Sequence, residues 1–141
     1  MDVEESVGEI LRRHEGRGGA LLPILNDVQA ALGHVPTAAV PLIAAALNLS
    51  RAEVHGVVTF YHDYKAAPAT RPVIKLCRAE ACQARGVDAI APILEGDARI
   101  EVETVYCLGL CAIGPSALVG DQVHVLRDAD EARRLADTVA A

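Results

Sequence analysis

Four cysteines occur in two closely spaced pairs, and the sequence contains no other cysteine. Cys77 and Cys82 are separated by four residues, and Cys107 and Cys111 by three. Thiolates are soft ligands that favour zinc and iron–sulfur clusters over hard cations. Four thiolates complete the ligand set of a structural zinc ion or of a [2Fe–2S] cluster. The spacing therefore predicts a metal site or a redox-active cluster.

Three interpretations of the cysteines remain open on spacing alone. A [2Fe–2S] cluster would make the protein a carrier of single electrons. A structural zinc site would make it a non-redox assembly scaffold, although zinc-binding pairs most often have only two intervening residues. The third interpretation is a set of buried or disulfide-bonded cysteines, and a reducing compartment would disfavour the disulfides.

A predicted β-strand leads into each cysteine pair. The first strand runs from Val73 to Cys77, and the second from Ile100 to Tyr106. Loops that follow such strands project from one edge of a sheet, so the two pairs can converge there. Backbone N–H groups of these loops can then point at the sulfurs and stabilise their negative charge.

The residues around the second pair suit a tight, partly dry turn. Gly109 lies between Cys107 and Cys111, where the absence of a Cβ permits the chain to wrap closely around a metal. Apolar neighbours are expected to keep water from one side of the site, and they are Leu108, Leu110, Ala112 and Ile113. Solvent exclusion and N–H···S hydrogen bonds are two of the factors that set a cluster's reduction potential.

The remaining elements after residue 66 complete an alternating pattern. Ala66 to Pro72 indicates a linker, because it is rich in Ala and Pro. The pattern then predicts a helix over Gln83–Leu94, short strands at Ala117–Val119 and Gln122–Leu126 joined by a Gly120-Asp121 turn, and a closing helix over Asp130–Ala140. The order β-α-β-β-β-α indicates a thioredoxin-like domain over residues 67–141.

Residues 1–66 show helical periodicity. Leu21, Leu25, Val28 and Leu32 line one helix face, with Gly33 as the expected stop. A second helix is expected from an N-cap at Thr37 to Leu49. A third begins at a capping box of Ser50 and Glu53 and is expected to bury the stripe Val54, Val57, Val58 and Tyr61. The predicted fold class is therefore α+β: an N-terminal helical bundle over residues 1–66, followed by the thioredoxin-like domain.

Composition argues against several functions. The formal net charge is −6, and no long basic cluster is present, which disfavours nucleic acid as a partner. The acidic N-terminus does not resemble a secretory signal, and the longest apolar run is too short to insert in a membrane. We therefore expect a cytoplasmic protein. No nucleophile–base pair or phosphate-binding glycine loop is evident, so the chain alone is expected to be non-catalytic.

Taken together, these motifs resemble the thioredoxin-like [2Fe–2S] ferredoxin subunits of NADH-linked enzymes. Both cysteine pairs match that family in spacing and order, and the Cys107–Pro115 stretch is especially similar. Further matching segments in the helical part are Leu22–Leu25, Val28-Gln29, Gly33–Pro36 and Val54–Tyr61. The resemblance implies one [2Fe–2S] cluster held by Cys77, Cys82, Cys107 and Cys111, with one pair on each iron.

The resemblance also implies a set of partners. The family includes the 24-kDa-type subunit of respiratory NADH dehydrogenase, a diaphorase subunit of bidirectional hydrogenases, and the gamma subunit of NAD-dependent formate dehydrogenase. Respiratory members often have Gly-Thr inside the first pair, whereas this chain has Arg78-Ala79-Glu80-Ala81 and is more similar to the formate dehydrogenase branch. That similarity implies an FMN- and NAD-binding iron–sulfur subunit and a molybdenum-containing formate dehydrogenase subunit as partners.

Two other groups of residues allow more than one role. Thr59, Phe60 and Tyr61 are either a strip that contacts a partner or a helix end that plugs the join to the second domain. The five histidines could be imagined as ligands, but four cysteines already complete the set. We therefore expect His14, His34, His55, His62 and His124 to have no ligand role.

Overall fold

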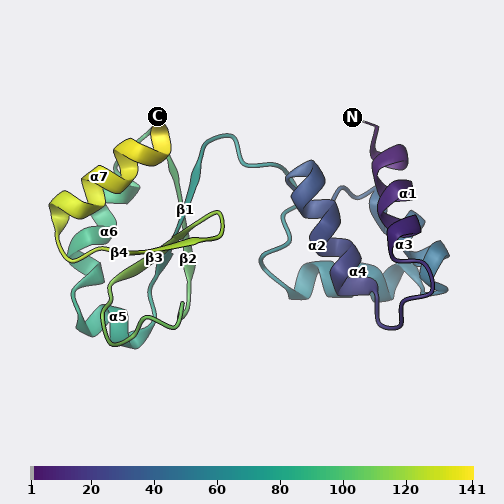
Figure 1. Ribbon diagram of the computed structural model, residues 1–141, viewed down its shortest axis with the longest axis horizontal. Coiled ribbons are helices and arrows are strands. Elements are labelled where there is room, and N and C mark those ends of the chain that lie inside the picture. Colours follow the sequence, from purple (N-terminus) through teal and green to yellow (C-terminus); the bar gives the residue numbers. More distant parts are fainter. Residues whose placement is uncertain (1) are drawn as a thin grey trace. The chain divides into compact units, whose positions relative to one another are not determined.

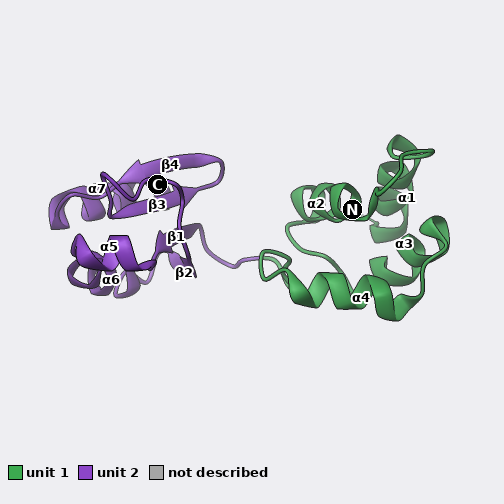
Figure 2. Cartoon of the chain, turned by 90° about the horizontal axis from the view of Figure 1, so that it is seen from below, with its two compact units in different colours: residues 1–68 green, residues 69–141 purple. Residues whose placement is uncertain are grey.

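The computed structural model describes residues 2–141, which fold into two compact units (Figures 1 and 2). The first unit comprises Met1–Pro68 and the second Ala69–Ala141. Each unit has its own hydrophobic core. Within residues 2–141, no helix is long and apolar enough to cross a membrane.

The first unit consists of helices packed around a small aliphatic core. The helices are α1 (Val3–Arg13), α2 (Leu21–Leu32), α3 (Ala39–Leu47) and α4 (Arg51–Phe60). The predicted helix α2 is confirmed, including its end at Gly33, which has the left-handed φ of 76°. Of the predicted face, Leu25 and Val28 are fully buried, whereas Leu21 and Leu32 at its two ends are half-buried. The largest buried side chains of this unit are Ile24, Leu25, Ile43, Val7, Val28 and Val54.

The next two helices differ from expectation at their ends. Helix α3 begins at Ala39, and its N-cap is Ala38 without a side-chain hydrogen bond, so the predicted cap at Thr37 is wrong. Helix α4 has the predicted capping box. Only Val54 of its expected buried stripe is buried; Val57 and Val58 are half-buried. Tyr61 is 43% exposed and is the C-cap of the helix, which ends at Phe60.

The capping box of α4 yields a testable stability difference. The Glu53 N–H donates to Ser50 Oγ at 3.1 Å, and the Ser50 N–H donates to the Glu53 carboxylate at 2.7 Å. The backbone and side-chain hydrogen bonds from Ser50 lower the pKa of Glu53, so this contribution is present above the ordinary glutamate pKa and is lost in acid. At neutral pH, Ser50→Ala should destabilise α4 by about 1 kcal/mol, seen as faster amide hydrogen exchange in that helix.

A matched control for Ser50→Ala is Thr37→Ala. Thr37 is exposed and precedes a helix in the same unit, but it is not the N-cap of that helix. Its replacement should leave exchange in α3 unchanged. Equal effects of the two substitutions would contradict the capping assignment.

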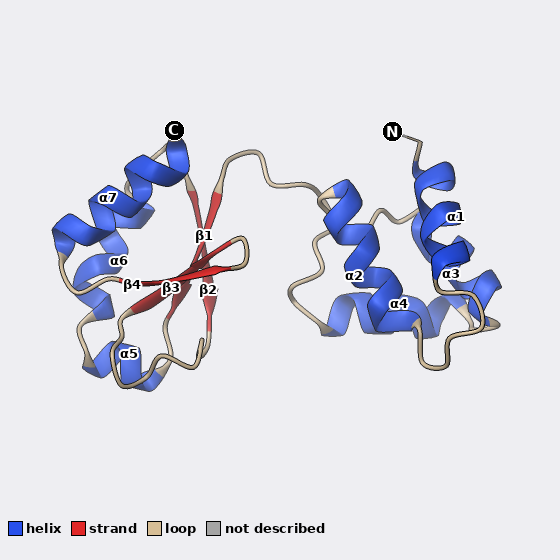
Figure 3. Cartoon of the chain, viewed as in Figure 1, coloured by secondary structure: helices blue, strands red, loops and turns tan. Residues whose placement is uncertain are grey.

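The second unit is a mixed four-stranded sheet with helices packed on it (Figure 3). Its elements are β1 (Val73–Cys77), α5 (Glu80–Ala84), α6 (Val87–Glu95), β2 (Glu101–Val105), β3 (Ser116–Val119), β4 (Gln122–Val125) and α7 (Ala129–Ala140). The strand order is β2-β1-β3-β4, with β1 parallel to β2 and antiparallel to β3, and β3 antiparallel to β4. The predicted α+β, thioredoxin-like fold is confirmed.

The helix predicted over Gln83–Leu94 is two helices. Helix α5 ends at Ala84, and α6 begins at Val87 after Gly86 adopts a φ of 97°. The periodicity missed this break because apolar residues continue on both sides of Gly86. The break matters for the site, because it places Cys82 in a short helix of its own, α5.

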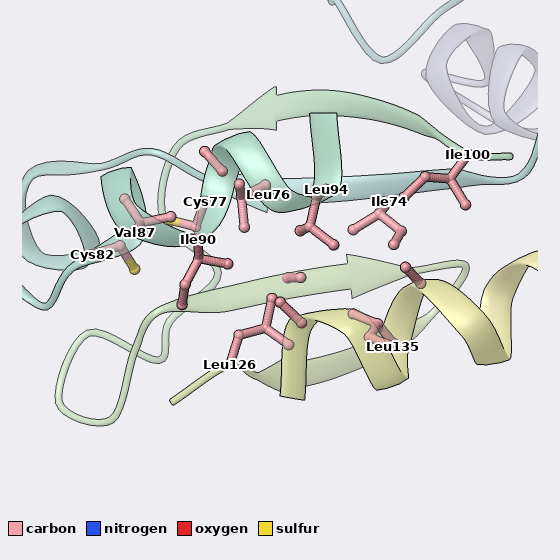
Figure 4. Packing of buried hydrophobic residues seen from close by; sticks show 14 residues of the cluster. Ile74, Leu76, Cys77, Cys82, Val87, Ile90, Leu94, Ile100, Leu126 and Leu135 are labelled. Atoms are coloured by element: carbon pink, nitrogen blue, oxygen red, sulfur yellow. The ribbon is translucent and has the colours of Figure 1, made fainter. Parts of the chain in front are cut away.

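The core of the second unit lies between one face of the sheet and helices α6 and α7 (Figures 1 and 4). Ile74 and Leu76 alternate with outward residues along β1 and are fully buried. Ile90 and Leu94 of α6 and Leu135 of α7 pack against the same cluster. Cys77 and Cys82 belong to the end of this core, beside Val87 and Ile90 (Figure 4).

Candidate metal centre

The four cysteines lie on three different parts of the second unit. Cys77 is the last residue of β1, and Cys82 lies in α5. Cys107 and Cys111 lie in the long loop between β2 and β3. All four are free thiols; Cys77 and Cys82 are buried, whereas Cys107 and Cys111 are exposed. One pair is therefore built into the core, and the other faces solvent.

Parallel pairing of β1 with β2 brings the two pairs together. Cys77 is the register partner of Val105, and the Arg78 N–H donates to the Val105 carbonyl at 2.9 Å, so the strands stay paired up to the cysteine. Cys107 follows Val105 by two residues. Its backbone N–H donates to Cys77 Sγ at 3.2 Å. The expected approach of the two strand ends is thus observed for Cys77 and Cys107.

The backbone around Cys77 forms a small anion-binding turn. Cys107 adopts a φ of 67°, which is rare for a residue with a side chain and typical of functional sites. This conformation directs the successive N–H groups of Cys107 and Leu108 at Cys77 Sγ, and the Ala79 N–H adds a third donor. Burial raises the pKa of the Cys77 thiol, but these hydrogen bonds, with one from Cys82, outweigh it and lower that pKa. The site therefore favours a thiolate at Cys77.

The second pair is close enough to act as a chelate. Cys107 Sγ and Cys111 Sγ are 3.6 Å apart. The side-chain hydrogen bond with Cys107 is the largest of the effects that raise the pKa of Cys111; the charges of Cys107 and Cys82 act in the same direction. The charge of Cys82 thus contributes to the raised pKa of Cys111, and a hydrogen bond with Cys82 contributes to the lowered pKa of Cys77.

Gly109 is needed for its backbone conformation. It has a φ of 79°, a region that side chains disfavour. A Cβ built at this position would meet no protein atom within 4 Å, so the protein itself leaves room for a side chain there. The expected close approach of Gly109 to the bound group stays a prediction. The turn between the two thiols depends on left-handed residues at both Cys107 and Gly109.

The expected apolar cover over the second pair is also only partly present. Leu108 and Leu110 are half-buried, but Ala112 is exposed and Ile113 is 52% exposed. The neighbouring Tyr106 is 74% exposed. The dry side of the site is the opposite one, where Cys77 and Cys82 meet the core. The exposed side consists of the Cys107–Ile113 loop.

Three residues near Cys82 were not identified as site residues from the sequence. A Cβ at Gly114 would lie 2.9 Å from Cys82 Sγ, so only glycine fits there. Arg85 Nε donates to the Gly114 carbonyl at 2.8 Å and ties the loop to the end of α5. The Ser116 hydroxyl lies 3.7 Å from Cys82 Sγ. Their positions depend on contacts between segments about thirty residues apart, for which the sequence carries no local signal.

The four cysteine thiols are arranged in pairs, which suits a cofactor that binds two ligands at each of two metal ions. Among residues 2–141, no three His, Cys, Asp or Glu side chains are arranged to hold a single metal ion. The thiols instead contact pairwise, and their number and softness match a cluster with two irons. Of the histidines, His14 pairs with Asp27 at 2.8 Å and His34 bonds the Leu32 carbonyl, both in the first unit.

Comparison with protein families decides between the remaining interpretations. The family model described as thioredoxin-like [2Fe-2S] ferredoxin matches residues 7–140, which is nearly the whole chain. The chain belongs to the thioredoxin-like [2Fe–2S] ferredoxin family. The cofactor of this ferredoxin is one [2Fe–2S] cluster, and its role is electron transfer. The zinc-scaffold interpretation is thereby set aside.

Several curated proteins resemble this ferredoxin. A subunit of the NADH-quinone oxidoreductase of Rhizobium meliloti is 29% identical over 140 residues, which cover 92% of the chain and 83% of that protein. An NADH-quinone oxidoreductase subunit of Escherichia coli K12 is 29% identical over 85% of the chain and 79% of its own length. The HndA subunit of the NADP-reducing hydrogenase of Solidesulfovibrio fructosivorans is 27% identical over 75% of the chain and 68% of its own length.

Proposed function

We propose that Cys77, Cys82, Cys107 and Cys111 hold the [2Fe–2S] cluster, with one pair on each iron. The observation that carries this proposal is that the ends of β1 and β2 bring the two cysteine pairs together, with the Cys107 N–H donating to Cys77 Sγ at 3.2 Å. When bound, such a cluster accepts and donates one electron at a time.

The protein's own groups would perform three tasks at this site. The N–H groups of Ala79, Cys107 and Leu108 stabilise the thiolate of Cys77. The core around Cys77 and Cys82 excludes water from one side. The exposed Cys107–Ile113 loop leaves the other side accessible, so electrons would enter and leave through that face.

We propose that this electron-transfer subunit belongs to an NAD-dependent formate dehydrogenase. The relatives are named as subunits of NADH-quinone oxidoreductase and of NADP-reducing hydrogenase, so the same kind of subunit serves several nicotinamide-linked enzymes. The Arg78–Ala81 stretch supports the formate branch by resemblance. The partners would be an FMN- and NAD-binding iron–sulfur subunit and a molybdenum-containing subunit. A respiratory complex or a hydrogenase diaphorase is the alternative.

We further propose a division of labour between two domains, residues 1–66 and 67–141. The second would carry the cluster, and the first would be the main docking surface for the flavin subunit. Phe60 is 73% exposed, and Tyr61 beside it is 43% exposed. Exposed large apolar side chains that lie together are typical of protein interfaces. We also propose a cytoplasmic location, because cysteines that form no disulfides are typical of that reducing compartment.

Metal analysis and electron paramagnetic resonance test the proposed function. The purified chain should contain iron and acid-labile sulfide in a one-to-one ratio, with about two irons per chain. It should be reddish-brown and give a signal from one unpaired electron after dithionite reduction. A colourless protein with one zinc per chain and no signal on reduction would contradict the proposal.

Affinity purification from the native cells tests the parent complex. A tagged chain should recover a flavin subunit together with a molybdenum-containing subunit, and the mixture should reduce NAD⁺ with formate. Recovery of membrane subunits with quinone-reducing activity would assign the chain to a respiratory complex, and recovery of a hydrogenase would assign it to a diaphorase.

A further inference from the structure

Ser116 is a fully buried polar residue beside the cluster ligands. It is the first residue of β3, its exposed fraction is 0%, and its Oγ lies 3.7 Å from Cys82 Sγ. Cys82 itself is only 2% exposed. Within the described chain, Cys82 is the hydrogen-bond partner found for this hydroxyl. Burying a hydroxyl costs free energy, and alanine would occupy the same core position without that cost. A buried serine whose partner is a sulfur is therefore unusual.

The direction of this hydrogen bond follows from the chemistry of the ligand. A cysteine bound to iron is a thiolate and has no proton to donate. The Ser116 hydroxyl must then be the donor and Cys82 Sγ the acceptor. Hydrogen bonds to ligand sulfurs are among the factors that set the potential of iron–sulfur clusters.

The surrounding structure holds the two groups in this arrangement. Ser116 is fixed by the register of β3, in which it pairs with Val125 of β4. The Gly114 backbone packs against Cys82 Sγ, and Arg85 Nε holds the Gly114 carbonyl at 2.8 Å. The backbone positions of Ser116 and of the loop beside Cys82 are therefore both fixed, which keeps the hydroxyl within reach of Cys82 Sγ.

We propose that Ser116 is a positioning residue that raises the cluster's reduction potential by donating its O–H to Cys82 Sγ. The proposal rests on the proposed ligand role of Cys82. Reduction adds one negative charge to the cluster and its ligands, so a donor at a ligand sulfur stabilises the reduced state more than the oxidised one. Removal of the hydroxyl should make the cluster harder to reduce.

Ser116→Ala is the direct test, because it removes the hydroxyl with little change in volume. Redox titration of the full chain, followed by electron paramagnetic resonance, should show the reduction equilibrium shifted about tenfold toward the oxidised state, or 59 mV for a one-electron couple. Ser116→Thr keeps the hydroxyl and should stay close to the wild-type potential. Exchangeable-proton couplings measured by electron–nuclear double resonance should lose one strong component in Ser116→Ala alone.

Ser6→Ala provides a matched control. Ser6 Oγ is also buried, and in the described part of the chain it has no hydrogen-bond partner. It lies in the first unit, whereas all four cysteines lie in the second. Its replacement should leave the potential and the proton couplings unchanged.

Each other outcome would overturn the proposal. A wild-type potential in Ser116→Ala would show that the hydroxyl does not act on the ligand, and equal shifts in Ser116→Ala and Ser116→Thr would show a steric effect. If Ser116→Ala does not fold, Ser116→Gly removes the same hydroxyl, and failure of both would make the residue structural. Absence of iron from the wild-type chain would instead refute the proposed function.

Discussion

Replacing Cys107 with alanine is expected to abolish the [2Fe–2S] cluster. Cys107 supplies one thiol of the exposed pair, 3.6 Å from Cys111 Sγ, and the chain has no spare cysteine to replace it. The free energy of cluster binding is available only to the folded second unit, so its loss should also lower that unit's stability. The purified variant should contain less than about a tenth of the wild-type iron and give no signal on reduction.

Tyr106→Ala is the matched control for this substitution. Tyr106 precedes Cys107 in the same loop and is 74% exposed. Its replacement removes an exposed side chain that is not a proposed cluster ligand. This variant should keep its iron and its spectrum. A full cluster in Cys107→Ala would refute the ligand assignment, and loss of the cluster from both variants would show that the loop fails for reasons other than ligation.

A methyl group at Gly114 should have an effect of similar size. A Cβ there would lie 2.9 Å from Cys82 Sγ, a distance that requires the sulfur or the loop to move. Neither can move freely, because Cys82 is buried in the core and the Gly114 carbonyl is held by Arg85. Overpacking of this kind costs about 1–3 kcal/mol. Gly114→Ala should therefore lose most of its iron and unfold at a lower denaturant concentration.

Gly18→Ala separates this steric effect from a general intolerance of the chain to glycine replacement. A Cβ at Gly18 meets no atom within 4 Å, and its φ lies outside the positive region. Its replacement should change neither iron content nor the unfolding midpoint. Gly114→Ala with wild-type iron and stability would show that the loop adapts, and the close packing on Cys82 would then have no role in ligand placement.

Much of the architecture could be predicted because it depends on short-range patterns. Three elements follow from residues within a few positions of one another: the hydrophobic repeat of α2, the capping box of Ser50 and Glu53, and the strand that ends at Cys77. The fold class and the family follow from the combination of these elements with the two cysteine pairs. The errors fell at places where local patterns are ambiguous, such as the break at Gly86 and the start of α3.

The sequence by itself determined the chemistry of this protein: four cysteines in two pairs, in a family that carries a [2Fe–2S] cluster. Only the tertiary structure decided which groups surround each sulfur. Three of these contacts join residues that are about thirty positions apart: the Cys107 N–H with Cys77, Gly114 with Cys82, and the Ser116 hydroxyl with Cys82. Such contacts depend on the pairing of β1 with β2 and β3, and strand register is set by the packing of the whole sheet rather than by any local pattern.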